Sequence, residues 1–121
     1  MKNKNILALA YIGDAVYELY IRNYLISKTI EKVNELQKTA VNYVSAKNQA
    51  KFLKEMFDNN FLSEEEIDII KRARNHKSHS SKTTDIITYK HATALEALIG
   101  YHYLDNNNER IKEIMSFILG E

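Results

Sequence analysis

The chain has 121 residues, with 17 lysines and arginines against 16 aspartates and glutamates, a formal net charge of +1. This length suits one domain with one hydrophobic core, and the near-neutral charge indicates no class of partner. The absence of cysteine excludes disulfides, a thiolate metal site and a cysteine nucleophile. Every apolar run is shorter than the roughly 20 residues of a membrane span. Because no cleavage pattern follows the first run, we expect a cytoplasmic protein.

Helices dominate the predicted secondary structure. The chain has no proline and only three glycines, so residues that punctuate turns and sheet edges are scarce. Apolar residues recur at helical spacing in six segments, and no segment resembles a strand. The predicted helices cover residues 5–27, 31–43, 45–58, 63–75, 86–105 and 109–119. We therefore expect an all-α fold.

These six helices differ in how apolar they are. The first is apolar around nearly its whole circumference, which predicts a central, buried helix. The second and third are apolar on one side only. The fourth begins with a capping-box pattern, Ser63 followed by Glu66. The fifth is again strongly apolar, and the last is amphipathic, so we expect the first and fifth helices to form the centre of the bundle.

Each of the two apolar helices carries an acid in otherwise apolar sequence. Asp14 stands in ILALAYIGDAV after Gly13, and Glu96 stands in ATALEALIGYHYL one turn before Gly100. A buried carboxylate without a partner shifts its pKa or costs several kcal/mol, and glycines allow two helix backbones to approach closely. We hypothesise that the two acids converge on a divalent cation. Carboxylate ligands of this kind favour Mg²⁺, which can activate water and neutralise charge on a phosphodiester.

The residues alone leave simpler interpretations open. An acid in an apolar helix can also form a salt bridge or belong to a narrow polar stripe. Glu18, one turn after Asp14, is placed either to pair with Arg22 at i+4 or to hold waters of the metal as a third acid. Without an HExxH pattern or a cysteine, we expect no histidine metal site, and His91 and His102 are expected near the polar edge of their helix.

Three segments resemble the ribonuclease III family. LAYIGDAVYELYIRNYL resembles its signature helix, in which an acid follows Leu/Ile-Gly and precedes Ala-Val, and ATALEALIGYHYLD resembles its second acidic helix. YVSAKNQA is similar to the Val-Ser-x-x-x-Leu-Ala stretch between them. Order and spacing agree across nearly the whole chain. The likeness is greatest to the Mini-III branch, which lacks the appended double-stranded-RNA-binding domain, and the end of the chain at Glu121 fits that branch.

The resemblance implies a fold, an activity and partners. It implies one ribonuclease III-like catalytic domain over residues 1–121, acting as a homodimer. The implied reaction is Mg²⁺-dependent hydrolysis of both strands of an RNA duplex, with Mn²⁺ as a substitute. The implied target is the paired ends of the large-subunit (23S) ribosomal RNA precursor, with stimulation by ribosomal proteins as a further expectation. By position, Asp14 and Glu96 match the family's essential acids, both as metal ligands and catalytic residues.

Two departures from the family pattern bear on the site. Full-length members usually carry a glutamate where this chain has Ala10 and an aspartate where it has Thr93. The Mini-III branch is similar in lacking both, so their absence does not imply an inactive enzyme. With two of four acids missing, we expect one tightly held Mg²⁺, and a second ion recruited by RNA phosphates stays open as an alternative. The missing acids also keep open a non-catalytic double-stranded-RNA-binding dimer. A helical protein-interaction module is a third hypothesis.

Residues 71–82, KRARNHKSHSSK, form a basic segment with five lysines and arginines, two histidines and no acid. Such a segment is often only a solvated surface, but lysine and arginine also bind phosphates by releasing counterions. The resemblance implies that this loop engages the RNA duplex. The expected RNA contacts are Arg72, Arg74, Lys77, His79, Lys82, Lys47 and Gln49.

Tyrosines line part of the first predicted helix. Tyr11, Tyr17 and Tyr20 lie on it at short intervals. They either contribute to a twofold interface or pack in the core, and the sequence does not distinguish these alternatives.

Overall fold

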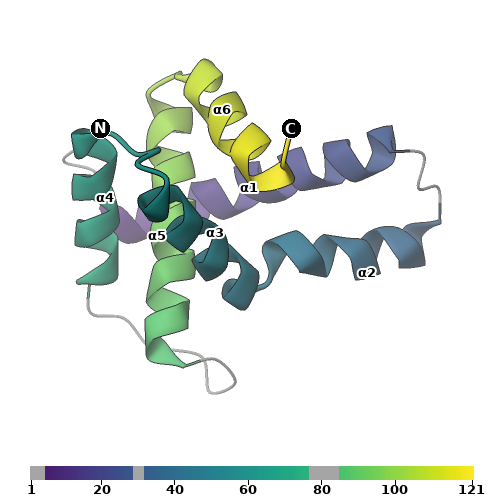
Figure 1. Cartoon of the computed structure of the whole chain (residues 1–121), viewed down its shortest axis with the longest axis horizontal. Helices are drawn as coiled ribbons and strands as arrows, with labels where there is room; N and C mark the ends of the chain where they lie inside the picture. Colours follow the sequence, from purple (N-terminus) through teal and green to yellow (C-terminus); the bar gives the residue numbers. More distant parts are fainter. Residues whose placement is uncertain (1–4, 29–31, 77–84) are drawn as a thin grey trace.

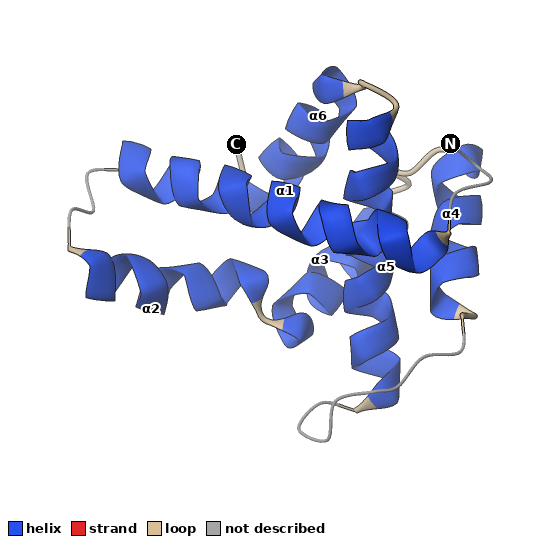
Figure 2. Cartoon of the chain, turned by 180° about the vertical axis from the view of Figure 1, so that it is seen from behind, coloured by secondary structure: helices blue, strands red, loops and turns tan. Residues whose placement is uncertain are grey.

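The computed structural model describes residues 5–28, 32–76 and 85–121, and this part of the chain contains six helices and no strand (Figure 1; Figure 2). The helices are α1 (Ile6–Ser27), α2 (Val33–Val44), α3 (Ala46–Asp58), α4 (Glu64–Arg74), α5 (Ile86–Leu104) and α6 (Asn108–Leu119). The all-α prediction is confirmed, and each observed boundary lies within about two residues of its predicted position. None of the described helices is long and apolar enough to cross a membrane.

Helix α5 is the centre of the fold. It crosses α1, and α3, α4 and α6 lie around it (Figure 1). Nearly every residue from Ala92 to His102 is buried, as its apolar sequence predicts. The expectation for α1 is only partly met. Leu9, Tyr17 and Ile21 are fully buried, but α1 also exposes large apolar side chains, including Tyr11 at 83%.

The crossing of α1 and α5 is a contact between two backbones. A Cβ atom built on Gly13 would lie 1.7 Å from the carbonyl oxygen of Glu96, and one built on Gly100 would lie 1.9 Å from that of Leu9. No side chain fits at either position. The sequence therefore places a glycine on each helix where the two helices touch, and the neighbouring residues of both helices are brought together.

Helices α2 and α3 meet at a corner that is fixed to α1. The Tyr17 hydroxyl donates to the carbonyl oxygen of Tyr43 at 2.6 Å, and the Tyr43 ring stacks on Phe52. Ser45 caps α3 by accepting from the Asn48 N–H. Beyond this corner α2 runs beside the C-terminal half of α1 and buries none of its residues completely (Figure 1).

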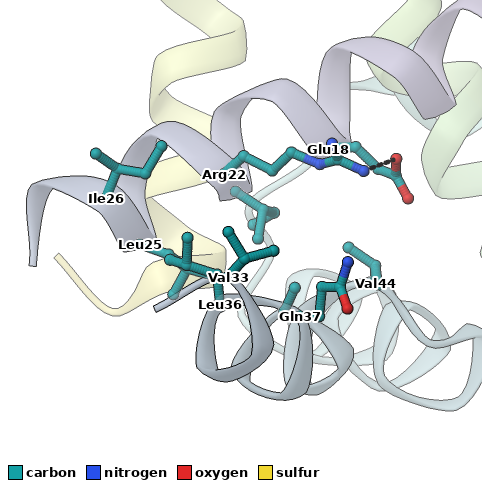
Figure 3. A pocket seen from close by; sticks show the side chains of 10 residues that line it. Glu18, Arg22, Leu25, Ile26, Val33, Leu36, Gln37 and Val44 are labelled. Atoms are coloured by element: carbon teal, nitrogen blue, oxygen red, sulfur yellow. Dashed lines mark hydrogen bonds and ion pairs between the residues drawn. The ribbon is translucent and has the colours of Figure 1, made fainter. Parts of the chain in front are cut away.

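A groove of about 370 Å³ separates α2 from the C-terminal half of α1 (Figure 3). Its walls are mainly apolar, with Leu25 and Ile26 from α1 and Val33 and Leu36 from α2. The two helices are thus joined at the corner and separated along the groove.

A buried carboxylate joins α4, α5 and α6. The predicted capping box is present, and its acid, Glu66, is only 2% exposed. One Glu66 oxygen lies 2.7 Å from His102 Nε2, and Arg110 donates to both Glu66 oxygens at 2.7 and 2.8 Å. Burial alone would raise the pKa of Glu66, but these hydrogen bonds hold it well below its ordinary value. The expectation that His102 lies near a polar edge was wrong, because His102 is buried. Its burial is possible because Glu66, the capping acid of α4, supplies a hydrogen-bond partner in the core.

Candidate active site

Asp14 and Glu96 meet where α1 crosses α5. Asp14 directly follows Gly13, whose backbone touches that of Glu96. The Asp14 side chain is close enough to share a hydrogen bond with the Glu96 carboxyl group. The structure therefore brings together the two acids that the sequence singled out, although they are 82 positions apart. Their catalytic role remains a prediction.

The pair lies at the surface of the bundle and not in its apolar interior. Asp14 is exposed and Glu96 is partly buried, because the apolar neighbours of both acids point to other faces of the helices. Burial of Glu96, followed by the Asp14 charge and the hydrogen bond with Asp14, raises the pKa of Glu96 to about 8. A hydrogen bond from Gln49 acts in the opposite direction, and the Glu18 charge adds to the increase.

This donor set fits a hard divalent cation that retains water. Two adjacent carboxylates repel each other, and a cation between them would remove that repulsion. Within the described ranges, no group of three or more His, Cys, Asp or Glu side chains could enclose a metal ion. A pair without a full cage suits Mg²⁺, which keeps several waters and usually takes one or two protein carboxylates.

The two positions where family members carry further acids add none here. Ala10 and Thr93 lie one turn before Asp14 and Glu96 on their helices, and both are buried. Glu18 forms the expected i+4 ion pair, with 3.4 Å between its carboxylate and Arg22 Nη2 (Figure 3). The Glu18 charge also raises the pKa of Glu96. A role of Glu18 in holding water at the site stays a prediction.

Six of the seven residues expected to contact RNA fall into three groups. Arg72 and Arg74 lie on the last turn of α4, where the Arg74 guanidinium sits 5.9 Å from the centre of the Phe57 ring. Lys47 is exposed on the first turn of α3. The remaining basic-loop candidates lie outside the described residues: Lys77, His79 and Lys82.

Gln49 has surroundings that the sequence did not suggest. It is only 3% exposed, and its Nε2 donates to Glu96 Oε2 at 3.4 Å. Its spacing carried a usable signal, because Gln49, Leu53 and Met56 share the buried face of α3. A lone polar residue on such a face marks a buried partner.

The tyrosines of α1 divide between the two alternatives. Tyr17 is fully buried and belongs to the core, where burial and the nearby Glu96 charge raise its pKa. Tyr20 is partly buried against the core, and Tyr11 is exposed. Of these three tyrosines, Tyr11 and part of Tyr20 therefore remain available to a partner.

Comparison with known proteins defines the class to which this fold and site belong. The profile of the Ribonuclease III domain matches residues 7–107, a range that includes both acids and the basic segment. The chain belongs to the ribonuclease III family, as its motifs suggested, and it is an endoribonuclease. This result favours an enzyme over the non-catalytic dimer and the protein-interaction module.

The similar proteins narrow this class further. The chain is 46% identical over 119 residues to the Mini-ribonuclease 3 of Enterococcus faecalis, covering 98% of this chain and 90% of that one. It is 53% identical over 112 residues to the Mini-ribonuclease 3 of Brevibacillus brevis, covering 92% and 82%. A crystal structure of a Fusobacterium nucleatum protein superposes with a TM-score of 0.89 at 36% identity, covering 100% and 98%. The resemblance to the Mini-III branch is confirmed.

Proposed function

We propose that this protein is a Mg²⁺-dependent endoribonuclease that cuts both strands of double-stranded RNA as a homodimer. Its target is the paired ends of the 23S ribosomal RNA precursor in the cytoplasm. The observation that carries the proposal is the juxtaposition of Asp14 and Glu96 at a glycine-only helix crossing, where the Asp14 charge raises the pKa of Glu96. The names of the similar Mini-ribonucleases support the reaction class.

The chain's own residues prepare the reaction by fixing two charges. Asp14 and Glu96 would hold Mg²⁺, which when bound supplies an activated water and neutralises charge on the phosphodiester. The backbone contact at Gly13 fixes the helix positions from which the two carboxylates extend. Because the Glu96 pKa is raised to about 8, the pair shares a proton near neutral pH when no cation is present. Cation binding is therefore expected to release that proton.

The RNA duplex is proposed to bind through its backbone. A-form RNA offers phosphates, 2′-hydroxyls and shape, because its major groove is too deep and narrow for side chains to read. Arg72, Arg74 and Lys47 supply cationic groups on α4 and α3. Together with the proposed contacts of Lys77, His79 and Lys82, they would make binding depend on salt.

The homodimer is proposed to form through the exposed apolar side of α1. Tyr11, Leu19 and Ile26 are all well exposed on this helix, and Val33 is exposed across the groove on α2. Several exposed apolar side chains close together on α1 and α2 of a small protein are typical of an interface. A twofold axis there would present two copies of the acid pair, one for each RNA strand.

Asp14→Asn tests the proposal, because it preserves the shape of the side chain and removes one ligand charge. We expect loss of Mg²⁺-dependent cleavage of an end-labelled RNA duplex, with dimer mass and RNA affinity in Ca²⁺ unchanged. Asp58→Asn is the matched control, since Asp58 is exposed and pairs only locally with Lys54. Full cleavage by Asp14→Asn would overturn the proposed role. Cleavage of unrelated duplexes but not of the 23S precursor ends would overturn the proposed target.

A further inference from the structure

Gln49 is a polar residue on a face of α3 that is otherwise built for the core. It shares this face with Leu53 and Met56, both fully buried against the rest of the bundle. A buried amide is unfavourable unless it is hydrogen-bonded. An apolar side chain would therefore suit packing better at this position, and the presence of a glutamine points to a specific hydrogen-bond partner.

That partner is the carboxylate of Glu96. Gln49 Nε2 donates to Glu96 Oε2 at 3.4 Å, across the contact between α3 and α5. The Gln49 amide donates to one of the two carboxylate oxygens and so restricts the rotation of the Glu96 carboxylate. Because the amide is neutral, it orients the carboxylate and leaves the negative charge available to a cation. A lysine or arginine at this position would instead neutralise that charge.

The segment that carries Gln49 is itself fixed to the other acid-bearing helix. The Tyr17 hydroxyl, three residues after Asp14 on α1, donates to the Tyr43 carbonyl at 2.6 Å. Two residues after Tyr43, Ser45 caps the start of α3, and its carbonyl accepts from the Gln49 N–H at 2.9 Å. The corner between α2 and α3 therefore contacts α1 through Tyr43 and α5 through Gln49, beside both acids.

We propose that Gln49 is a positioning residue, which holds the Glu96 carboxylate in the orientation needed to bind a divalent cation beside Asp14. This inference rests on the proposed function, and it replaces the RNA contact first expected for Gln49. Such a partner of a metal ligand typically changes metal affinity or activity by about 10- to 100-fold when it is removed.

Gln49→Met tests this role, because methionine has a similar length and flexibility but no N–H donor. The probe is MnCl₂ alone, titrated calorimetrically into the metal-free full-length protein. We expect Mn²⁺ affinity to fall by about 10-fold or more, with thermal stability equal to or above that of the wild type. Cleavage should show a lower kcat with KM for the RNA duplex unchanged. Gln49→Leu should behave in the same way, and Gln37→Met, at an exposed position of α2, is the matched control.

Three outcomes would overturn the inference. Wild-type Mn²⁺ affinity in both Gln49 variants, with affinity lost in Asp14→Asn, would refute the positioning role and leave the proposed function intact. Mn²⁺ affinity unchanged in Asp14→Asn as well would refute both. Reduced RNA affinity at unchanged Mn²⁺ affinity would show that Gln49 contacts RNA instead.

Discussion

Gly13→Ala is expected to destabilise the protein strongly, although alanine is the better helix former. In an exposed helix this change should add about 1 kcal/mol of stability. Here the new Cβ would lie 1.7 Å from the Glu96 carbonyl oxygen and 2.8 Å from the Gly100 nitrogen. Both are backbone atoms of a buried helix, so no side-chain rotation can relieve the overlap.

The magnitude follows from what must move. Ordinary contact begins at 3.4 Å, so α1 and α5 would have to separate by about 1.7 Å at their crossing. Overpacking a core usually costs about 1–3 kcal/mol, and the separation also weakens dispersion contacts along both helices. We expect a loss of about 4 kcal/mol, a large part of the roughly 5–15 kcal/mol that stabilises a typical domain.

The assay is urea denaturation followed by far-ultraviolet circular dichroism, with Mn²⁺ titration of the folded fraction. Gly120→Ala is the control. Its φ is +74° and nothing lies within 4 Å of the added Cβ, so it should lose only about 1–2 kcal/mol through backbone strain. A Gly13→Ala protein as stable as the wild type, with its Mn²⁺ affinity intact, would refute the close backbone contact on which the site depends.

Two further predictions concern charge. Because the Glu96 pKa of about 8 lies above its ordinary value of 4.5, folding favours the protonated form, so stability should fall as the pH rises through this window. In urea titrations, the metal-free protein should thus be about 1–2 kcal/mol less stable at high pH than at mildly acidic pH. The Glu96→Gln variant should not show this difference. A wild-type stability that does not change with pH would contradict this reasoning. Lys47→Ala should weaken RNA binding and reduce the salt slope by about one, measured by fluorescence anisotropy against Lys54→Ala, and an unchanged slope excludes a phosphate contact.

The sequence was informative wherever periodicity or motif spacing acts locally. All six helices, the capping box of Ser63 and Glu66, and the Glu18–Arg22 pair follow from such patterns. The meeting of Asp14 with Glu96 was also predictable, since Asp14 follows Gly13 and Glu96 stands one turn before Gly100, each on an apolar helix.

What the sequence could not show depends on contacts between distant segments. The buried partners of Glu66 come from two other helices, and no local pattern announces them. Gln49 was expected to contact RNA, and its burial was not foreseen because burial depends on which way α3 turns. The exposure of α1 was missed for a similar reason, since an apolar sequence does not distinguish a core contact from a surface that awaits a partner.

The Glu66 cluster implies that stability is distributed unevenly along this chain. Opening any one of α4, α5 or α6 would strip a buried carboxylate of a partner, so these helices should unfold as one cooperative unit. Helix α2 buries no residue completely and borders a groove, so local fluctuations should concentrate there. We thus expect α4, α5 and α6 to form a stable unit behind the acid pair, and α2 to adjust its position beside it. Such a division would let the protein accommodate an RNA duplex without moving Asp14 and Glu96.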